Sequence, residues 1–199
     1  RMKNLIKTEF KRNLKSLILW TVIVAGLALL MLLLFPAFED IYADLEALLA
    51  GYPEGFLEAF GLGENGLEMD DIYGWFGVEG YLFVLLIGSV YAGLLGGGIL
   101  AKEEDEKTIE FLLTKPISRT EIYLGKLIVI LLNLALLNIG VSVVLFATFV
   151  SFDTIDWTLW ALYSFAPYII QLIFASVGLF ISVFVTKSRQ VTSIALGLV

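Results

Sequence analysis

Charged residues occur in short zones of this chain, and long apolar stretches without charge separate those zones. The 13 Lys and Arg residues fall into three groups, in residues 1–15, 102–126 and 187–189. Residues 36–80 contain neither Lys nor Arg, but they contain eleven Asp and Glu. An apolar stretch such as 17–35 is close to the roughly 20 residues that a helix needs to cross a bilayer. The pattern therefore predicts an all-α fold, a polytopic bundle of transmembrane helices.

The charges also predict which way the helices run. Loops rich in Lys and Arg stay in the cytoplasm, so we expect the N-terminus and residues 102–119 inside and residues 36–80 outside. Moving carboxylates into hydrocarbon would cost about 2.5–3.5 kcal/mol each, so this outer acidic region stays in water. The last predicted span is too short to cross a bilayer, and we expect it to continue beyond residue 199. The predicted spans of this single transmembrane domain, residues 1–199, are 17–35, 81–101, 122–150, 159–186 and 191–199.

Composition limits the chemistry that the chain can perform. Hydrophobic residues make up 59% of the chain and charged residues 17%, against about a quarter charged in globular domains. Histidine, the most frequent general base, and cysteine are both absent. The sequence has no G-x-x-x-x-G-K-[ST] phosphate loop, no EF-hand spacing among its acidic residues and no basic face for nucleic acid. We therefore expect no catalytic residue, no metal or cofactor bound by this chain, and no nucleic-acid partner.

The N-terminal residues 2–15 have an amphipathic pattern. Apolar side chains share one helical face, and lysines recur every fourth residue on another. Such a helix suits the cytoplasmic surface of the lipid bilayer, with its lysines toward anionic headgroups. After the first span, we expect Pro36 to end the helix and residues 38–50 to form an amphipathic helix on the outer surface. The lysines of the amphipathic segment 2–15 are Lys3, Lys7, Lys11 and Lys15.

Aromatic residues at 73–81 predict the point where the chain re-enters the membrane, because Trp and Tyr favour the interface. In the second span, Ser89, Gly93 and Gly97 recur every fourth residue, a spacing that lets two helix backbones approach closely. The facing helix belongs either to the same chain or to a second copy. The aromatic residues are Tyr73, Trp75, Phe76 and Tyr81.

Residues 102–119 form a densely charged cytoplasmic segment between two spans. Pro116 ends its helix. The residues from Ser118 to Glu121 then match a capping box, in which each side chain accepts a hydrogen bond from the other residue's backbone N–H. We therefore expect a new helix to start at this point. Lys126, near the inner end of that helix, is expected to extend its amine toward the membrane surface.

Few polar side chains lie inside the predicted spans. Asn133 and Asn138 point about 140° apart on an ideal helix, so they cannot form one polar stripe. This favours hydrogen bonds to neighbouring helices, and contact with a transported substrate is the alternative. Gln171 is a further candidate for such a polar pathway. No Asp or Glu lies deep in a predicted span, which argues against a proton-coupled carrier.

The segment 101–127, AKEEDEKTIEFLLTKPISRTEIYLGKL, resembles the permease subunits of ABC transporters of the type-2 export class. The resemblance lies in an acidic start, a Thr-x-Glu-x-Leu-Leu motif, a Pro-x-Ser-Arg motif and a Lys that enters the next span. Where the family usually has Gly before the Thr, this chain has Lys107. The matching residues are Glu103, Glu104, Thr108, Glu110, Leu112, Leu113, Pro116, Ser118, Arg119 and Lys126.

The resemblance implies a function. In this family, the segment between the second and third spans is a coupling helix that docks on a separate ATP-binding subunit, and that partner binds ATP and Mg²⁺ and drives export. It further implies a pathway formed by two permease copies, identical or related, with six spans each, in the cell membrane of a prokaryote. The residues expected to contact the ATPase subunit are Glu103, Glu104, Lys107, Thr108, Glu110, Phe111 and Leu112.

Other interpretations of the pattern stay open. The chain could act as a channel or carrier without a partner, or as a membrane anchor or sensor whose acidic outer region binds an extracellular ligand. In the coupling segment, Ile109, Leu112 and Leu113 could rest on the lipid headgroups instead of on a partner.

Overall fold

The computed structural model describes residues 2–49, 51–53, 55–56, 71–105, 118–152, 155–184, 193 and 197. Within these ranges the chain forms helices and no strand. Two short elements, α3 (Ile72–Trp75) and the π-helix η1 (Phe76–Gly80), lead directly into the second long helix. The long helices are α1 (Met2–Leu49), α4 (Tyr81–Asp105), α6 (Arg119–Ser151) and α7 (Trp157–Phe184).

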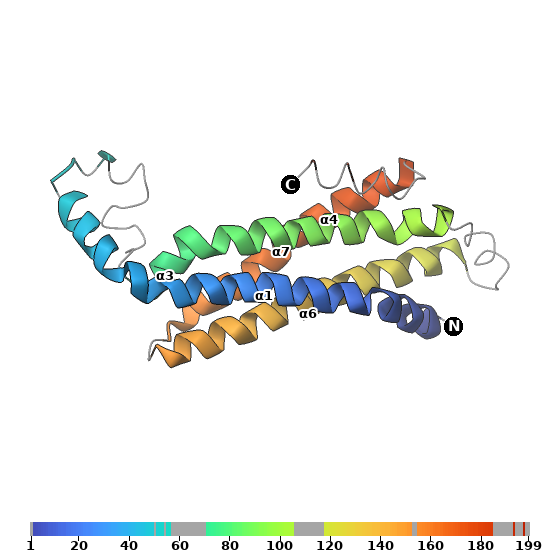
Figure 1. Ribbon diagram of the computed structural model, residues 1–199. Helices are drawn as coiled ribbons and strands as arrows, with labels where there is room; N and C mark the ends of the chain where they lie inside the picture. The colour runs from blue at the N-terminus through green and yellow to red at the C-terminus, as the bar shows by residue number, and fades with distance from the viewer. Residues whose placement is uncertain are drawn as a thin grey trace.

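The four long helices run side by side in alternating directions (Figure 1). Met2, Asp105 and Arg119 lie at one end of the bundle, called the N-terminal end below, whereas Ser151 and Trp157 lie at the opposite end. The most extensive contacts join α4 to α7 and α1 to α6, and smaller ones join α6 to α7 and α1 to α4. The helices therefore form a closed ring of two tightly packed pairs.

All four long helices have the length and composition of membrane spans. The stretches that qualify are Met2–Glu39, Ile72–Ile99, Arg119–Ser151 and Trp157–Phe184. Large apolar side chains cover the outside of the bundle, as on α7, where Phe165, Ile169 and Phe180 are all more than 60% exposed. Such a surface suits hydrocarbon rather than water. The predicted all-α, multi-span membrane protein is thus confirmed for four spans. The predicted fifth span, 191–199, lies outside the described residues except for 193 and 197.

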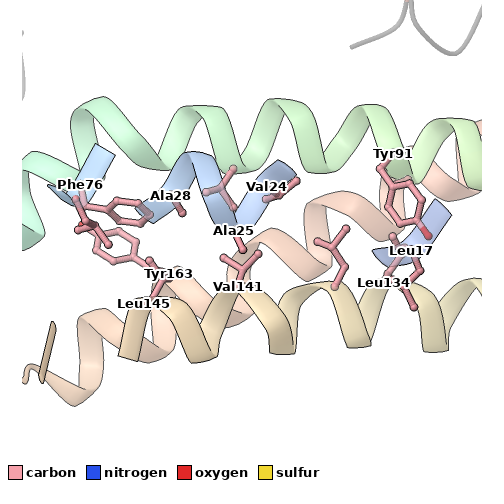
Figure 2. Close-up of a cluster of buried hydrophobic side chains, with 14 of the residues drawn as sticks. Leu17, Val24, Ala25, Ala28, Phe76, Tyr91, Leu134, Val141, Leu145 and Tyr163 are labelled. Atoms are coloured by element: carbon pink, nitrogen blue, oxygen red, sulfur yellow. The ribbon is translucent and has the colours of Figure 1, made fainter. Parts of the chain in front are cut away.

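The interior of the bundle is a single apolar cluster to which every long helix contributes (Figure 2). Small residues of α1, Ala25 and Ala28, lie across from Val141 and Leu145 of α6, which lets these two helices pack closely. Tyr91 of α4 lies at one side of the same cluster and is fully buried. Close packing of this kind holds helices together in a membrane, where hydrophobic burial between helices gives little driving force.

The prediction that Pro36 ends the first helix is wrong. The predicted surface helix 2–15, the first span 17–35 and most of the predicted outer helix 38–50 form one helix, α1, with Pro36 in its interior. Proline lacks an N–H and crowds the carbonyl one turn earlier, so inside a helix it can bend the helix without ending it. The end of α1 that follows Pro36 accordingly turns away from the bundle (Figure 1).

Most of the aromatic residues predicted to mark re-entry into the membrane are buried against other helices of the bundle. Tyr73, Trp75 and Phe76 pack into the end of the bundle opposite the N-terminal end. The Trp75 indole N–H donates to the carbonyl of Met31 at 2.7 Å, one turn before Pro36. The Tyr73 ring stacks on Phe149 of α6 with 4.1 Å between centroids. Tertiary packing therefore uses these side chains, together with Tyr163 of α7, to close this end of the bundle.

Three helix starts follow from local side-chain chemistry. Ser118 caps α6, with its hydroxyl accepting from the Glu121 N–H at 3.1 Å and the Glu121 carboxylate accepting from the Ser118 N–H at 2.8 Å. The predicted capping box is thus confirmed. Asp156 caps α7 by accepting from the N–H groups of Thr158 and Leu159. Asp71 accepts from the Tyr73 N–H and so caps α3.

Candidate functional site: polar contacts inside the bundle

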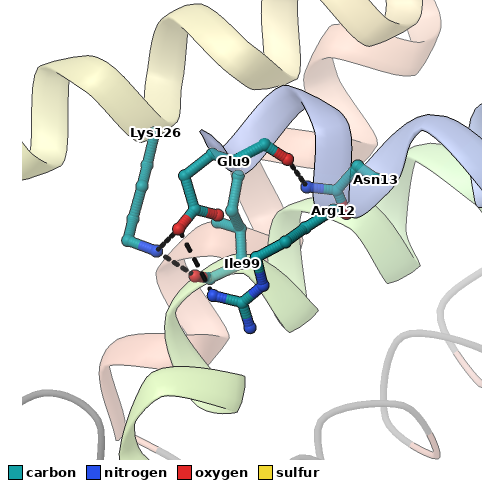
Figure 3. A network of polar contacts seen from close by, with 5 residues as sticks. All are labelled: Glu9, Arg12, Asn13, Ile99 and Lys126. Atoms are coloured by element: carbon teal, nitrogen blue, oxygen red, sulfur yellow. Dashed lines mark hydrogen bonds and ion pairs between the residues drawn. The ribbon is translucent and has the colours of Figure 1, made fainter. Parts of the chain in front are cut away.

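Lys126 is buried inside the bundle rather than extended to the membrane surface. The residue is 1% exposed, and its Nζ donates to the carbonyl of Ile99 in α4 at 2.8 Å (Figure 3). The same Nζ lies 3.6 Å from Oε1 of Glu9 in α1. The expectation that this amine reaches the surface is therefore wrong, because the interior supplies both a carbonyl and a carboxylate for it.

Glu9 is a functional candidate that the sequence interpretation missed. It is only 5% exposed, and it also contacts Arg12 Nη1 at 3.4 Å within its own helix. Glu9 precedes the first predicted span, 17–35, so it is not among the residues of the uncharged stretches. A signal was nevertheless present: Glu9 follows Leu5 by four residues, so it falls on the apolar face of α1 and not on the lysine face.

Asn133 and Asn138 reach different helices from α6. Asn133 Oδ1 accepts a hydrogen bond from the Tyr91 hydroxyl of α4 at 3.4 Å, and Asn138 Nδ2 donates to Gln171 Oε1 of α7 at 2.6 Å. Each Asn also donates to the carbonyl four residues earlier in α6. These contacts link α6 to both helices of the α4–α7 pair.

Gln171 occupies a tight position between α4 and α7. It is completely buried, and its amide nitrogen has no hydrogen-bond partner within the described part of the chain. That nitrogen rests where a side chain at Gly88 would otherwise be, so the absence of a Cβ at Gly88 makes room for the amide. A buried amide of this kind fixes the register of two helices more specifically than an apolar side chain would.

The small residues of α4 face α7 in the same chain. A Cβ at Gly178 of α7 would collide with the carbonyl oxygen of Gly93 and lie 2.9 Å from the nitrogen of Gly97. A Cβ at Gly96 would collide with the carbonyl of Ala175. Ser89, which lies one turn before Gly93 in α4, is buried as well. The stripe at Ser89, Gly93 and Gly97 therefore lies where the backbones of α4 and α7 approach each other closely.

The predicted ATPase-contact residues lie largely outside the part of the chain that the structure describes. The backbone of Glu103 and Glu104 belongs to the last turn of α4, at the N-terminal end of the bundle. Five residues of that end, at positions 9, 12, 13, 99 and 126, form the polar network of Figure 3. The predicted contacts outside the described residues are Lys107, Thr108, Glu110, Phe111 and Leu112.

These arrangements link helices to one another rather than assemble reactive groups. Each contact joins two or three helices through a buried amide, hydroxyl or ion pair. In a low-dielectric interior such bonds are directional and set the register of neighbouring helices. The polar groups thus define how the two helix pairs sit against each other.

Comparison with protein families places this bundle in a known group. The family model described as "ABC-2 family transporter protein" matches residues 3–199, nearly the whole chain. No curated protein and no solved structure matches the chain.

Proposed function

Since the chain belongs to the ABC-2 family of transporter proteins, we propose that it is the membrane-spanning permease subunit of an ATP-driven exporter. The match to the family model over residues 3–199 is the observation that carries this proposal. Four antiparallel helices with apolar outer faces support it, because they suit a subunit embedded in the bilayer. ATP hydrolysis belongs to a separate subunit that binds ATP and Mg²⁺, and this chain is a transport subunit rather than an enzyme.

The N-terminal end of the bundle faces the cytoplasm in this proposal. Lysines 3, 7 and 11 are exposed at that end, and the segment 102–119 connects two helix ends there. Basic residues stay on the cytoplasmic side of a membrane. The membrane in this proposal is the cell membrane of a prokaryote. The exposed Glu39 lies toward the opposite end, in keeping with an acidic outer region.

The segment 102–119 is the coupling element in this proposal. Its acidic residues, Glu103, Glu104 and Glu110, contact the ATP-binding subunit through a polar interface that can form and separate during turnover. Phe111 and Leu112 anchor the contact in an apolar pocket of the partner. Closure of the paired ATPases displaces this segment and tilts the helices attached to it.

A second permease copy, identical or related, completes the pathway in this proposal, and each copy has six spans. Asn133, Asn138 and Gln171 serve mainly to hold the helices of one copy together, because they are hydrogen-bonded across helices in the interior. A direct contact of these three residues with the substrate stays a prediction. It would require the two helix pairs to separate.

The proposal is tested by affinity purification of the tagged chain from its native membrane. We expect an ATP-binding subunit with a phosphate loop to co-purify, and we expect ATPase activity only in its presence.

Sided labelling tests the orientation in the same cells, because the chain contains no natural cysteine to react. With intact cells, an impermeant thiol reagent should modify a cysteine at residue 64 and spare one at residue 105. The reverse labelling would exclude the ATPase contact.

A further inference from the structure

The ion pair of Glu9 and Lys126 joins three helices at the N-terminal end of the bundle (Figure 3). Lys126 belongs to α6, Glu9 to α1 and the carbonyl of Ile99 to α4. Ile99 lies just before the segment 102–119 and Lys126 lies just after it. One ammonium group therefore binds the helices on both sides of the proposed coupling segment and connects them to α1.

Stability alone gives no reason to bury this pair. Taking a carboxylate and an ammonium group out of water is unfavourable, and apolar side chains of similar volume often stabilise a core as well or better. Unlike apolar packing, a buried ion pair is directional, so it holds each charged side chain against one specific partner. The position of this pair, where three helix ends meet, therefore points to a role in positioning those ends.

Packing beside the ion pair is also close. A Cβ at Gly125 would lie 3.0 Å from Cδ2 of Leu5, so α1 and α6 approach each other one turn away from the Glu9 carboxylate. Leu5 itself is buried in this contact. Packing and the ion pair thus attach the N-terminal turns of α1 to the first turns of α6.

We propose that Glu9 and Lys126 are positioning residues that transmit movement of the segment 102–119 to α1. This inference rests on the proposed function. Movement of the segment displaces the ends of α4 and α6, because the chain is continuous through them. The ion pair then makes the N-terminal turns of α1 follow, and α1 carries the displacement through the membrane.

A cysteine pair placed at Leu5 and Gly125 measures whether α1 follows α6. The sequence has no natural cysteine, and Leu5→Cys shortens the side chain that faces residue 125. The double variant is expressed with the ATP-binding subunit, and membranes are treated with a short bifunctional thiosulfonate, with or without ATP and vanadate. In the parent background we expect the same cross-linked fraction in both states, because α1 moves with α6.

Removal of the ion pair should make the cross-link depend on nucleotide. Glu9→Met together with Lys126→Met removes both charges at once, so neither is left buried without the other. We expect normal membrane levels and normal cross-linking without nucleotide, then loss of most of the cross-link with ATP and vanadate. Glu9→Gln, which keeps the side-chain size, should show a smaller loss of the same kind. Lys11→Gln is the control and should behave like the parent, because Lys11 is an exposed charged side chain on the same stretch of α1.

A reporter at residue 104 separates failure of this inference from failure of the proposed function. Bound ATPase should protect a cysteine at residue 104 from a maleimide, and nucleotide should alter that protection. Protection at residue 104, combined with equal cross-linking of the Glu9→Met, Lys126→Met variant in both states, would overturn the transmission role alone. An unprotected residue 104 would overturn the proposed function and this inference with it.

Discussion

Asn138 of α6 donates a hydrogen bond to Gln171 of α7 with 2.6 Å between nitrogen and oxygen, and both side chains are buried. The bond crosses between the two tightly packed helix pairs, α1–α6 and α4–α7. Inside a membrane bundle, hydrogen bonds of this type are expected to set which helices meet and in which register. Their strength is therefore measurable as a contribution to the stability of the folded chain.

Asn138→Leu and Gln171→Leu should each lower the free energy of unfolding by about 0.5–2 kcal/mol, because interhelical hydrogen bonds in membranes fall in that range. The measurement is unfolding of the purified protein in mixed micelles by a denaturing detergent. The double variant should lose less than the sum of the two single losses, since both changes remove the same bond.

Ser176→Ala provides a matched control for that cycle. The Ser176 hydroxyl is exposed and donates to the carbonyl of Leu172 in its own helix. We expect a change within about 0.5 kcal/mol. Strict additivity of the Asn138 and Gln171 losses would show that their contact contributes nothing to stability.

Gly178→Ala should destabilise the bundle, whereas Gly26→Ala should not. A Cβ at residue 178 collides with the backbone of Gly93, so α4 and α7 must move apart at a cost of about 1–3 kcal/mol. Gly26 has no neighbour within 4 Å of such a Cβ, and alanine there raises helix propensity by up to about 1 kcal/mol. The midpoints of thermal unfolding of the two variants should move in opposite directions. An unchanged midpoint for Gly178→Ala would mean that α4 and α7 accommodate the added methyl group without moving apart.

The sequence predicted the helices well because the signals for them are local. Four apolar stretches and the Ser118–Glu121 capping box each depend on residues close together in the chain, and each matches a helix or a helix start in the structure. Pro36 was misleading, because a proline inside a long helix bends it when the flanking turns are held by neighbouring elements. Here the neighbouring element is α3, whose Trp75 binds the carbonyl of Met31.

The buried polar contacts were harder to predict, because they depend on which helices meet. The sequence indicated that Asn133 and Asn138 point in different directions but not that Tyr91 and Gln171 face them. Likewise Lys126 was expected at the membrane surface, because it lies near the inner end of a predicted span. Its partners, Glu9 and the carbonyl of Ile99, come from two other helices.

Ser118→Ala should weaken the start of α6. Loss of the hydroxyl leaves the Glu121 N–H without its cap, at a cost of about 1 kcal/mol. Hydrogen exchange of the first-turn amides of α6 should accelerate by roughly fivefold for that cost, while exchange in the middle of α6 stays unchanged. Thr120→Ala is the control, since Thr120 lies in the same exposed turn. Equal exchange in the Ser118 and Thr120 variants would contradict a functional cap.

Charge reversal of the proposed coupling segment should weaken binding of the ATP-binding subunit. Glu103→Lys, Glu104→Lys and Glu110→Lys together replace attractive contacts with repulsive ones. Exposed ion pairs contribute about 0.2–1 kcal/mol each, so loss of three of them should weaken binding by roughly threefold to a hundredfold. Membrane insertion should be unaffected, because the added lysines strengthen the cytoplasmic charge that orients the helices.

The readouts are the amount of ATPase that co-purifies and its activity in the complex. Glu39→Lys, an exposed reversal toward the opposite end of α1, is the control and should retain full binding. If the triple variant retained its ATPase partner and its activity, the docking surface would have to lie elsewhere on the N-terminal end of the bundle.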